Sequence, residues 1–144
     1  MLRRRPALAA VTGVYLLAVA WITLNPFPPD PHGNGLLKQL LAFTADVAPL
    51  RWITFDVVEF TANVLMFVPM GVLFTLLLGL GRWWWALLIG VASTCFIEGV
   101  QLFLPNRYSD VRDLAANTLG TLIGIGIVAL VAVAARRRRP VQAA

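Results

Sequence analysis

The sequence is poor in the residues on which soluble enzymes and metal sites are usually built. Its 144 residues include one cysteine, Cys95, and one histidine, His32, and only 13% of them are charged. A single cysteine excludes an internal disulfide and a cysteine-cluster metal site. A lone histidine in a Pro/Gly-rich stretch leaves a histidine zinc site or a Ser-His-Asp triad little to build on. We therefore predict no metal and no cofactor, and we expect Cys95 to fill space within a helix.

Acidic residues are also scarce, because seven Asp and Glu stand against twelve Lys and Arg, for a net charge of +5. Such a basic balance can indicate nucleic-acid binding, but no recognised nucleic-acid motif accompanies it. The arginines lie instead at the ends of apolar runs, where membrane topology requires them. We therefore predict that nucleic acid is not a partner.

The sequence is rich in hydrophobic residues, which make up 59% of the chain and give a mean hydropathy of +0.78. Several runs approach the ~20 apolar residues that span a bilayer. This composition predicts an all-α membrane protein, a small bundle of four transmembrane helices in one domain of residues 1–144. The expected helices cover about 7–24, 60–80, 83–104 and 114–135, and 136–144 is expected to be a basic, disordered tail.

The first apolar run permits two interpretations. A basic start, an apolar middle and Ala18-Val19-Ala20 are also typical of a signal peptide with its cleavage site. We favour a retained helix, because the hydrophobicity continues through Leu24 and Asn25-Pro26 then supplies a stop.

A long connection, residues 25–56, follows the first expected helix. It opens as a proline-rich loop, whose composition resists regular structure. Between Leu36 and Phe43 apolar residues recur at helical spacing, in a run too short to cross a membrane. We predict a short helix lying on the membrane surface there.

Four crossings would place both termini on one side of the membrane, and the positive-inside rule selects that side. Eight arginines fall on the side of the termini, and four basic residues fall on the other. The first set is Arg3, Arg4, Arg5, Arg82 and Arg136 to Arg139, and the second is Lys38, Arg51, Arg107 and Arg112. Both termini are therefore predicted to be cytoplasmic, and every Asp and Glu lies in an outer loop or near an outer helix end.

With this topology, polar groups that are far apart in the sequence reach one depth. Glu59 and Asn63 share a helix face, as do Asp113 and Asn117, because each pair is four residues apart. Thr94, Glu98 and Gln101 would form one stripe, with Thr94 as its weakest member. The candidate binding residues are Glu59, Asn63, Glu98, Gln101, Arg107, Asp110, Arg112, Asp113 and Asn117.

A carboxylate within the apolar part of a bilayer is expensive and usually faces the bundle interior or water. Glu98 must therefore point inward, carry a proton or pair with a cation. The alternative is that these groups only tie helix ends together, with Asp113 capping its helix and the amides bonding across helices. That alternative explains Glu98 least well, because an inert bundle gains little from a buried carboxylate.

Two segments carry a family resemblance. The stretch from Asn63 to Gly71, NVLMFVPMG, resembles the "N, apolar, F, P, G" motif of the VanZ-like family. Its second motif, "E-x-x-Q … R … D-x-x-D-x-x-x-N-x-x-G", is matched by Glu98, Gln101, Arg107, Asp110, Asp113, Asn117 and Gly120. The ordered match covers roughly residues 60 to 124, and helix one and the proline-rich loop match only loosely.

The resemblance implies a multi-pass protein of the bacterial plasma membrane, and its namesake is linked to resistance to the glycopeptide teicoplanin. Our first hypothesis is a binding protein for a membrane lipid or lipid-linked cell-wall precursor. Arg107 and Arg112 would contact phosphate, and Asn63, Gln101 and Asn117 would contact sugar or amide groups. We favour this non-catalytic role.

Two alternatives remain open. The first is a membrane enzyme acting on a lipid-linked substrate, with Glu98 and either Asp110 or Asp113 as acid and base, or holding a divalent cation. The second is a small transporter, for which a homo-oligomer would enlarge the path.

Overall fold

The structure is a computed structural model, and it describes residues 5–25, 35–105 and 110–137. The described residues are helical throughout, without a strand. The α-helices are α1 (Pro6–Leu24), α2 (Leu36–Asp46), α3 (Phe55–Leu78), α4 (Trp83–Gln101) and α5 (Val111–Arg137), with two short 3₁₀ turns, η2 (Ala48–Leu50) and η3 (Leu80–Arg82). The proline-rich loop and the last residues of the tail, 26–34 and 138–144, lie outside the described residues.

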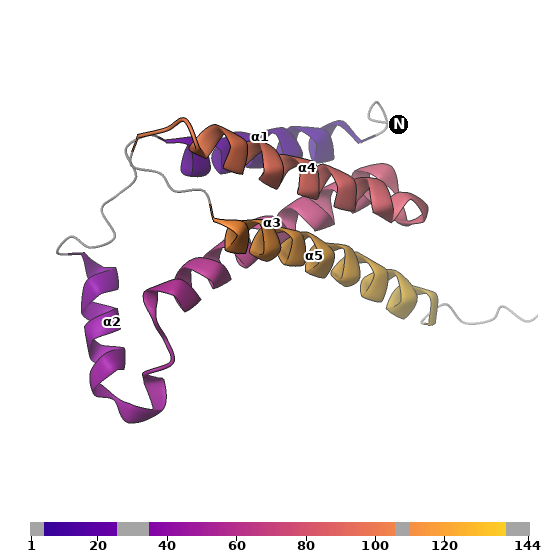
Figure 1. Ribbon diagram of the computed structural model, residues 1–144. Coiled ribbons are helices and arrows are strands. Elements are labelled where there is room, and N and C mark those ends of the chain that lie inside the picture. Colours follow the sequence, from indigo (N-terminus) through magenta and orange to yellow (C-terminus); the bar gives the residue numbers. More distant parts are fainter. Residues whose placement is uncertain (1–4, 26–34, 106–109, 138–144) are drawn as a thin grey trace, which may run out of the picture.

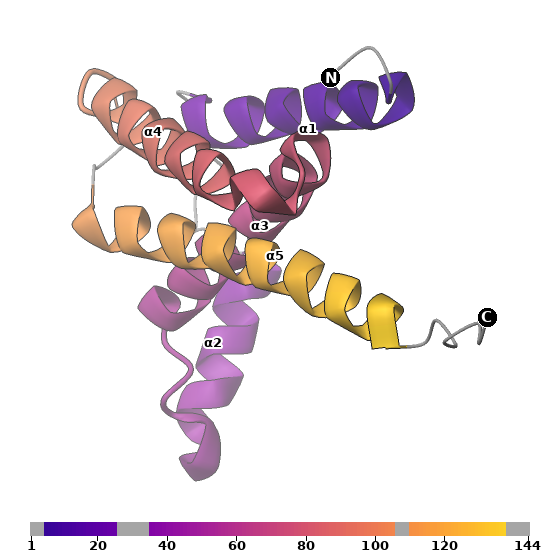
Figure 2. The ribbon, with the colours of Figure 1, turned by 90° about the vertical axis from the view of Figure 1, so that its right-hand side faces the viewer.

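Four of the helices in the described part of the chain, α1, α3, α4 and α5, are long and apolar enough to cross a membrane, as predicted. Figures 1 and 2 show α1 beside α4 and α3 crossing α5, with α2 projecting away from the other helices. The expected helix near Leu36 is therefore present as α2, while its place on the membrane surface stays a prediction.

The second long helix begins and ends earlier than the predicted 60–80. It begins at Phe55 because Thr54 caps it: the Thr54 hydroxyl oxygen accepts from the backbone N–H of Val57 at 3.4 Å, and Asp56 lies in the first turn. It ends at Leu78 because Gly79 turns the chain with a positive φ of 85°. Pro69 lies inside α3, as expected, without ending it.

The other two boundaries differ for similar local reasons. Helix α4 ends at Gln101 rather than 104, because the chain tightens into three-residue turns, such as Leu104 N–H to the Gln101 carbonyl, ahead of Pro105. Helix α5 begins at Val111 rather than 114 and continues to Arg137, into the segment predicted to be a disordered tail.

Helices α3 and α5 share the most extensive contact of the bundle, and glycines make it possible. A side-chain carbon added at Gly71 would lie 2.1 Å from the Thr121 carbonyl oxygen. One added at Gly120 or Gly124 would lie 2.2 Å from a carbonyl oxygen of α3. Gly120 and Gly124 thus allow the backbones of α3 and α5 to approach closely, whereas Gly126 has open space beside it.

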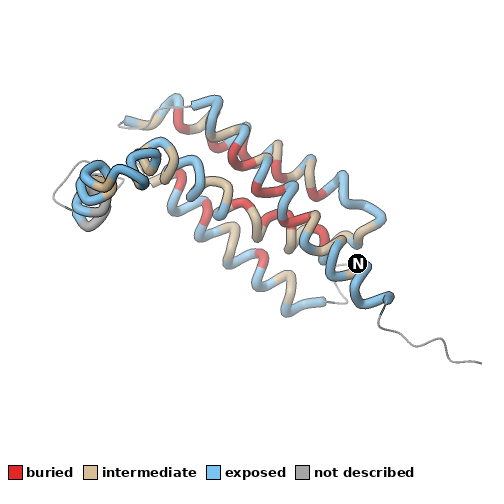
Figure 3. The backbone as a smooth tube through the Cα atoms, turned by 90° about the horizontal axis from the view of Figure 1, so that it is seen from below, coloured by how far each residue is buried: buried red, intermediate tan, exposed pale blue. Residues whose placement is uncertain are grey.

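The described interior is small and mixes polar with apolar side chains, and the exterior is large and apolar. Buried polar side chains include Thr12, Thr75 and Thr121, while Trp21, Leu65 and Leu130 are more than half exposed. Figure 3 shows that the buried residues gather where the long helices meet. Such an arrangement fits a surface covered by lipid rather than water. Cys95 lies within α4, as expected of a residue in a helix, but it is exposed and does not fill space in the interior of the bundle.

Helix α1 packs through Val19 against Phe67, Met70 and Ile97. The Tyr15 hydroxyl donates to the Met66 carbonyl oxygen at 2.7 Å, in the turn before Pro69. Since proline removes a backbone donor from α3, a neighbouring helix that satisfies a nearby carbonyl group helps α3 to tolerate it.

Candidate functional site

Polar side chains from α3, α4 and α5 meet at one end of the bundle, which we call the polar end. It comprises the predicted residues Glu59, Asn63, Glu98, Gln101, Asp110, Arg112, Asp113 and Asn117, together with Asp56. Arg107, the ninth predicted residue, lies outside the described residues. The polar end forms because α3 and α5 both begin there and α4 finishes there.

The first polar link joins α3 to α5. The Asn63 side-chain amide donates to a carboxylate oxygen of Asp113 at 2.7 Å, and both residues are partly buried. A hydrogen bond to an ionised carboxylate is shorter and stronger than one between neutral groups. This contact therefore fixes where α5 begins relative to α3.

The second link joins α4 to the start of α5. The backbone N–H of Asp110 donates to Glu98 Oε2 at 3.0 Å, and Asp110 Oδ1 accepts from the backbone N–H of Arg112 at 2.8 Å. Asp110 is therefore the capping residue of α5, and Asp113, which sequence reasoning considered for that role, pairs with Asn63 instead.

Asn117 lies one turn deeper than Asp113 and is only 3% exposed. Its amide nitrogen donates to the Thr94 hydroxyl oxygen at 2.9 Å, and the Thr121 hydroxyl donates to its backbone carbonyl oxygen. Its side-chain oxygen Oδ1 has no hydrogen-bond partner within the part of the chain that the structure describes. Thr94, expected to be the weakest of the stripe on α4, is thus a direct link between α4 and α5.

Gln101 faces a different helix from Glu98. Its amide nitrogen donates to the Thr23 carbonyl oxygen of α1 at 3.0 Å, and it is 6% exposed. Its side-chain oxygen Oε1 is buried and finds no partner in residues 5–25, 35–105 and 110–137. The predicted stripe therefore divides, with Thr94 and Glu98 directed to α5 and its preceding turn, and Gln101 directed to α1.

The carboxylates of the polar end lie near one another. Those of Glu59, Glu98 and Asp110 are close enough to repel the charge of Asp113, and Asp56 acts likewise on Glu59. Arg112 pairs with Asp56 at 3.1 Å, but both side chains are 68% exposed, so the ion pair contributes little to stability. Within the described residues, no three of these groups are placed to hold a metal ion.

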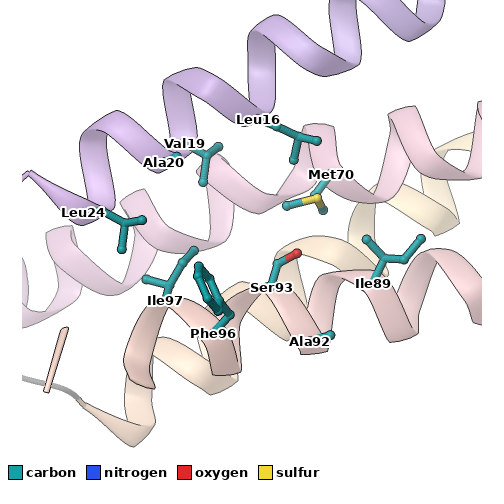
Figure 4. Close-up of a pocket in the computed structure, with 10 residues that line it drawn as sticks. All are labelled: Leu16, Val19, Ala20, Leu24, Met70, Ile89, Ala92, Ser93, Phe96 and Ile97. Carbon is teal, nitrogen blue, oxygen red and sulfur yellow. The ribbon is translucent and has the colours of Figure 1, made fainter. Parts of the chain in front are cut away.

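An apolar groove of about 390 Å³ begins next to the polar end. Figure 4 shows side chains of α1 and α4 facing each other across it, with Met70 of α3 between them. It runs from Leu16 to Leu24 along α1, roughly 12 Å of helix rise. The lining residues are Leu16, Val19, Ala20, Leu24, Met70, Ile89, Ala92, Ser93, Phe96 and Ile97.

Sequence reasoning missed this groove and two polar contacts. Ala20, Ala92 and Ser93 leave the space open, but small residues are common in apolar helices and give no warning of a cavity. Thr23 takes part through its backbone carbonyl, which no side-chain pattern could reveal. Asp56 was considered only as the entrance to a helix, and its partner lies 56 residues away.

The contact between Asn63 and Asp113 predicts a measurable coupling. In a double-mutant cycle of Asn63→Ala and Asp113→Ala, we expect about 1 kcal/mol of interaction energy in thermal or denaturant unfolding of the detergent-solubilised protein. The matched control pairs Asn63→Ala with Asp46→Ala, an exposed acidic residue of α2. The effects of those two changes on the free energy of unfolding should add within about 0.5 kcal/mol. Additive effects for Asn63 and Asp113 as well would contradict the link.

The profile of the VanZ/LLP1 family matches residues 12–132, which include every predicted site residue and both sides of the groove. No curated protein and no solved structure matches the chain.

Proposed function

Because the chain belongs to the VanZ/LLP1 family, we propose that this multi-pass membrane protein binds a cell-envelope lipid or lipid-linked precursor at its polar end. The observation that carries the proposal is the convergence of Asn63, Glu98 and Asn117, from three helices, on one end of the bundle. A bundle held together only by its helix ends has no need of so many acceptors at one level.

Two buried oxygens support binding over a purely structural role. Among the described residues, Asn117 Oδ1 and Gln101 Oε1 are both enclosed without a donor, as is Thr75 Oγ1 farther along α3. A buried acceptor without a partner costs about 1–3 kcal/mol. A bound molecule that donates to either oxygen would remove that cost, whereas a cluster that served stability alone would be expected to satisfy them.

In this proposal the polar end faces the outside of a bacterial plasma membrane. Arg5, Arg82 and Arg136 lie at the opposite end of their helices, consistent with cytoplasmic termini. A polar end on the outer face is where cell-wall precursors are exposed to glycopeptides. Binding there would change what such antibiotics reach, and this is the route by which we propose that the protein contributes to teicoplanin resistance or to an envelope stress response.

The partners of the carboxylates favour binding over catalysis. Asp113 already accepts from Asn63, and Glu98 accepts from the Asp110 backbone. Such bonds hold each carboxyl group in a fixed orientation. A carboxyl group that is already engaged in this way suits recognition of a ligand better than it suits exchange of protons with a substrate.

Native mass spectrometry of gently extracted protein tests this proposal. We expect the wild type to retain an envelope lipid and Glu98→Ala to retain several-fold less of it, because Glu98 also positions Asp110. Asp46→Ala, which removes an acidic side chain of α2, should retain as much as the wild type. In cells that depend on the protein for teicoplanin tolerance, Glu98→Ala should lower it. A wild-type protein that carries no lipid would contradict the proposed function.

A further inference from the structure

The polar end has the charge of a cation-binding surface. Five carboxylates gather there, those of Asp56, Glu59, Glu98, Asp110 and Asp113, and their charges repel one another. Arg112 pairs with Asp56, and Arg107 lies outside the described residues, but the five carboxylates outnumber these two arginines of the segment that ends in Asp113. A surface with this excess of negative charge attracts positive groups and repels phosphates.

Two polar atoms near these carboxylates lack a partner among the described residues and need donors. Gln101 Oε1, on a side chain that is only 6% exposed, lies at the contact between α4 and α1. Asn117 Oδ1 lies one turn below Asp113. An amide oxygen and a carboxylate can only accept hydrogen bonds, whereas an ammonium group carries three donors and no acceptor. An ammonium group would therefore suit both the buried amide oxygens and the negative charge of the polar end.

The apolar groove lies where the hydrocarbon chain of a lipid could reach the polar end. Its end at the polar side is formed by Leu24 and Ile97, and Gln101 is one turn beyond Ile97. Its volume lies within the ~300–1,000 Å³ of typical ligand sites. Ser93 is the one polar side chain among the lining residues, so the groove suits a hydrocarbon. A lipid whose chain lies in the groove would extend its headgroup over the polar end.

We infer that the lipid is a phospholipid with an ethanolamine-type headgroup, its acyl chain in the α1–α4 groove and its ammonium group facing the polar-end carboxylates. This inference rests on the proposed function and names the class of lipid. Charge complementarity selects the headgroup, because a purely anionic lipid or a pyrophosphate-linked precursor would bring negative charge to the carboxylates. The ammonium group is the part of such a lipid that lies farthest from its chains, and Glu59 and Asp110 lie nearer the outer ends of α3 and α5 than Asn63 and Asn117 do.

Lipid retention by the full-length protein tests this inference. Detergent-solubilised protein is mixed with equal amounts of phosphatidylethanolamine, phosphatidylglycerol and an isoprenoid pyrophosphate, and the bound fractions are measured by native mass spectrometry. We expect phosphatidylethanolamine to exceed the other two by about tenfold, the contribution of one charge-assisted hydrogen bond. Glu59→Gln combined with Asp110→Asn should remove this preference.

The groove is tested separately with a matched pair on α1. Ala20→Phe fills the groove and should reduce binding of all three lipids by about tenfold or more, whereas Ala18→Phe, exposed and outside the lining, should not. Thermal unfolding of each variant verifies that it is folded. A preference for either anionic lipid would overturn the inference and leave the proposed function standing. Unchanged binding by folded Ala20→Phe would also overturn it, and no retention of any lipid by the wild type would overturn both.

Discussion

Gly124→Leu is expected to prevent α5 from packing on α3 and to leave little folded protein. The atoms nearest to a side chain at this position are the Val68 carbonyl oxygen at 2.2 Å and the Val72 backbone nitrogen at 2.8 Å. Backbone atoms within a helix cannot move aside as a flexible side chain can. Overpacking typically costs about 1–3 kcal/mol, and a clash with backbone belongs at or above the upper limit.

Gly126→Leu provides the matched control two residues farther along α5. Nothing lies within 4 Å of a side-chain carbon there, so the leucine extends into open space and favours the helix relative to glycine. Size-exclusion chromatography and thermal unfolding in detergent would compare the two variants. Gly124→Leu should be aggregated or markedly less stable, and Gly126→Leu should match the wild type. Similar stability of both variants would show that α3 and α5 are not in close contact.

Asn117→Asp is expected to cause a similarly large loss of stability, because it adds a charge rather than because it changes the size of the side chain. The two side chains have nearly the same shape, but Asp carries a negative charge at a position that is 3% exposed. The described partner there is the hydroxyl of Thr94, not a cation. A buried ion without a counter-ion costs several kcal/mol.

The pH dependence distinguishes charge from shape. At low pH the introduced carboxyl group binds a proton and loses its charge. The loss of stability of Asn117→Asp relative to the wild type should therefore shrink as the pH falls and grow as it rises. The measurement is thermal unfolding across a pH series, relative to the wild type. Ala115→Asp introduces the same group at an exposed position of α5 near the polar end and should show a much smaller deficit. A deficit of Asn117→Asp that does not change with pH would contradict burial of Asn117.

The helices were predictable because a run of apolar residues long enough to cross a bilayer has few other interpretations. The close contact at Gly120 and Gly124 was also predictable, since glycines four residues apart lie on one helix face. Boundaries were less accurate. The helix was expected to begin at 60 rather than at Phe55 because Asp56 and Glu59 interrupt the hydrophobic run, although acidic residues are favourable in the first turn of a helix.

The site was predictable in membership but not in its pairings. Spacing indicated that Asn63 and Asp113 lie at one depth, and it could not show that they face each other. Glu98 and Gln101 are three residues apart, which turns their side chains roughly 60° from each other around α4. That rotation is enough to direct Gln101 to α1. Cys95 could not be placed at all, because both faces of an apolar helix are apolar and hydrophobicity no longer distinguishes inside from outside.

The contact between α3 and α5 also has a consequence for biosynthesis. A ribosome releases the chain from its amino end, so α5 enters the bilayer last of all. Until Gly120 and Gly124 emerge, α3 lacks the neighbour against which it packs most extensively. A nascent polypeptide interrupted before that point holds three loosely associated spans, and such products should be preferred substrates of membrane proteases.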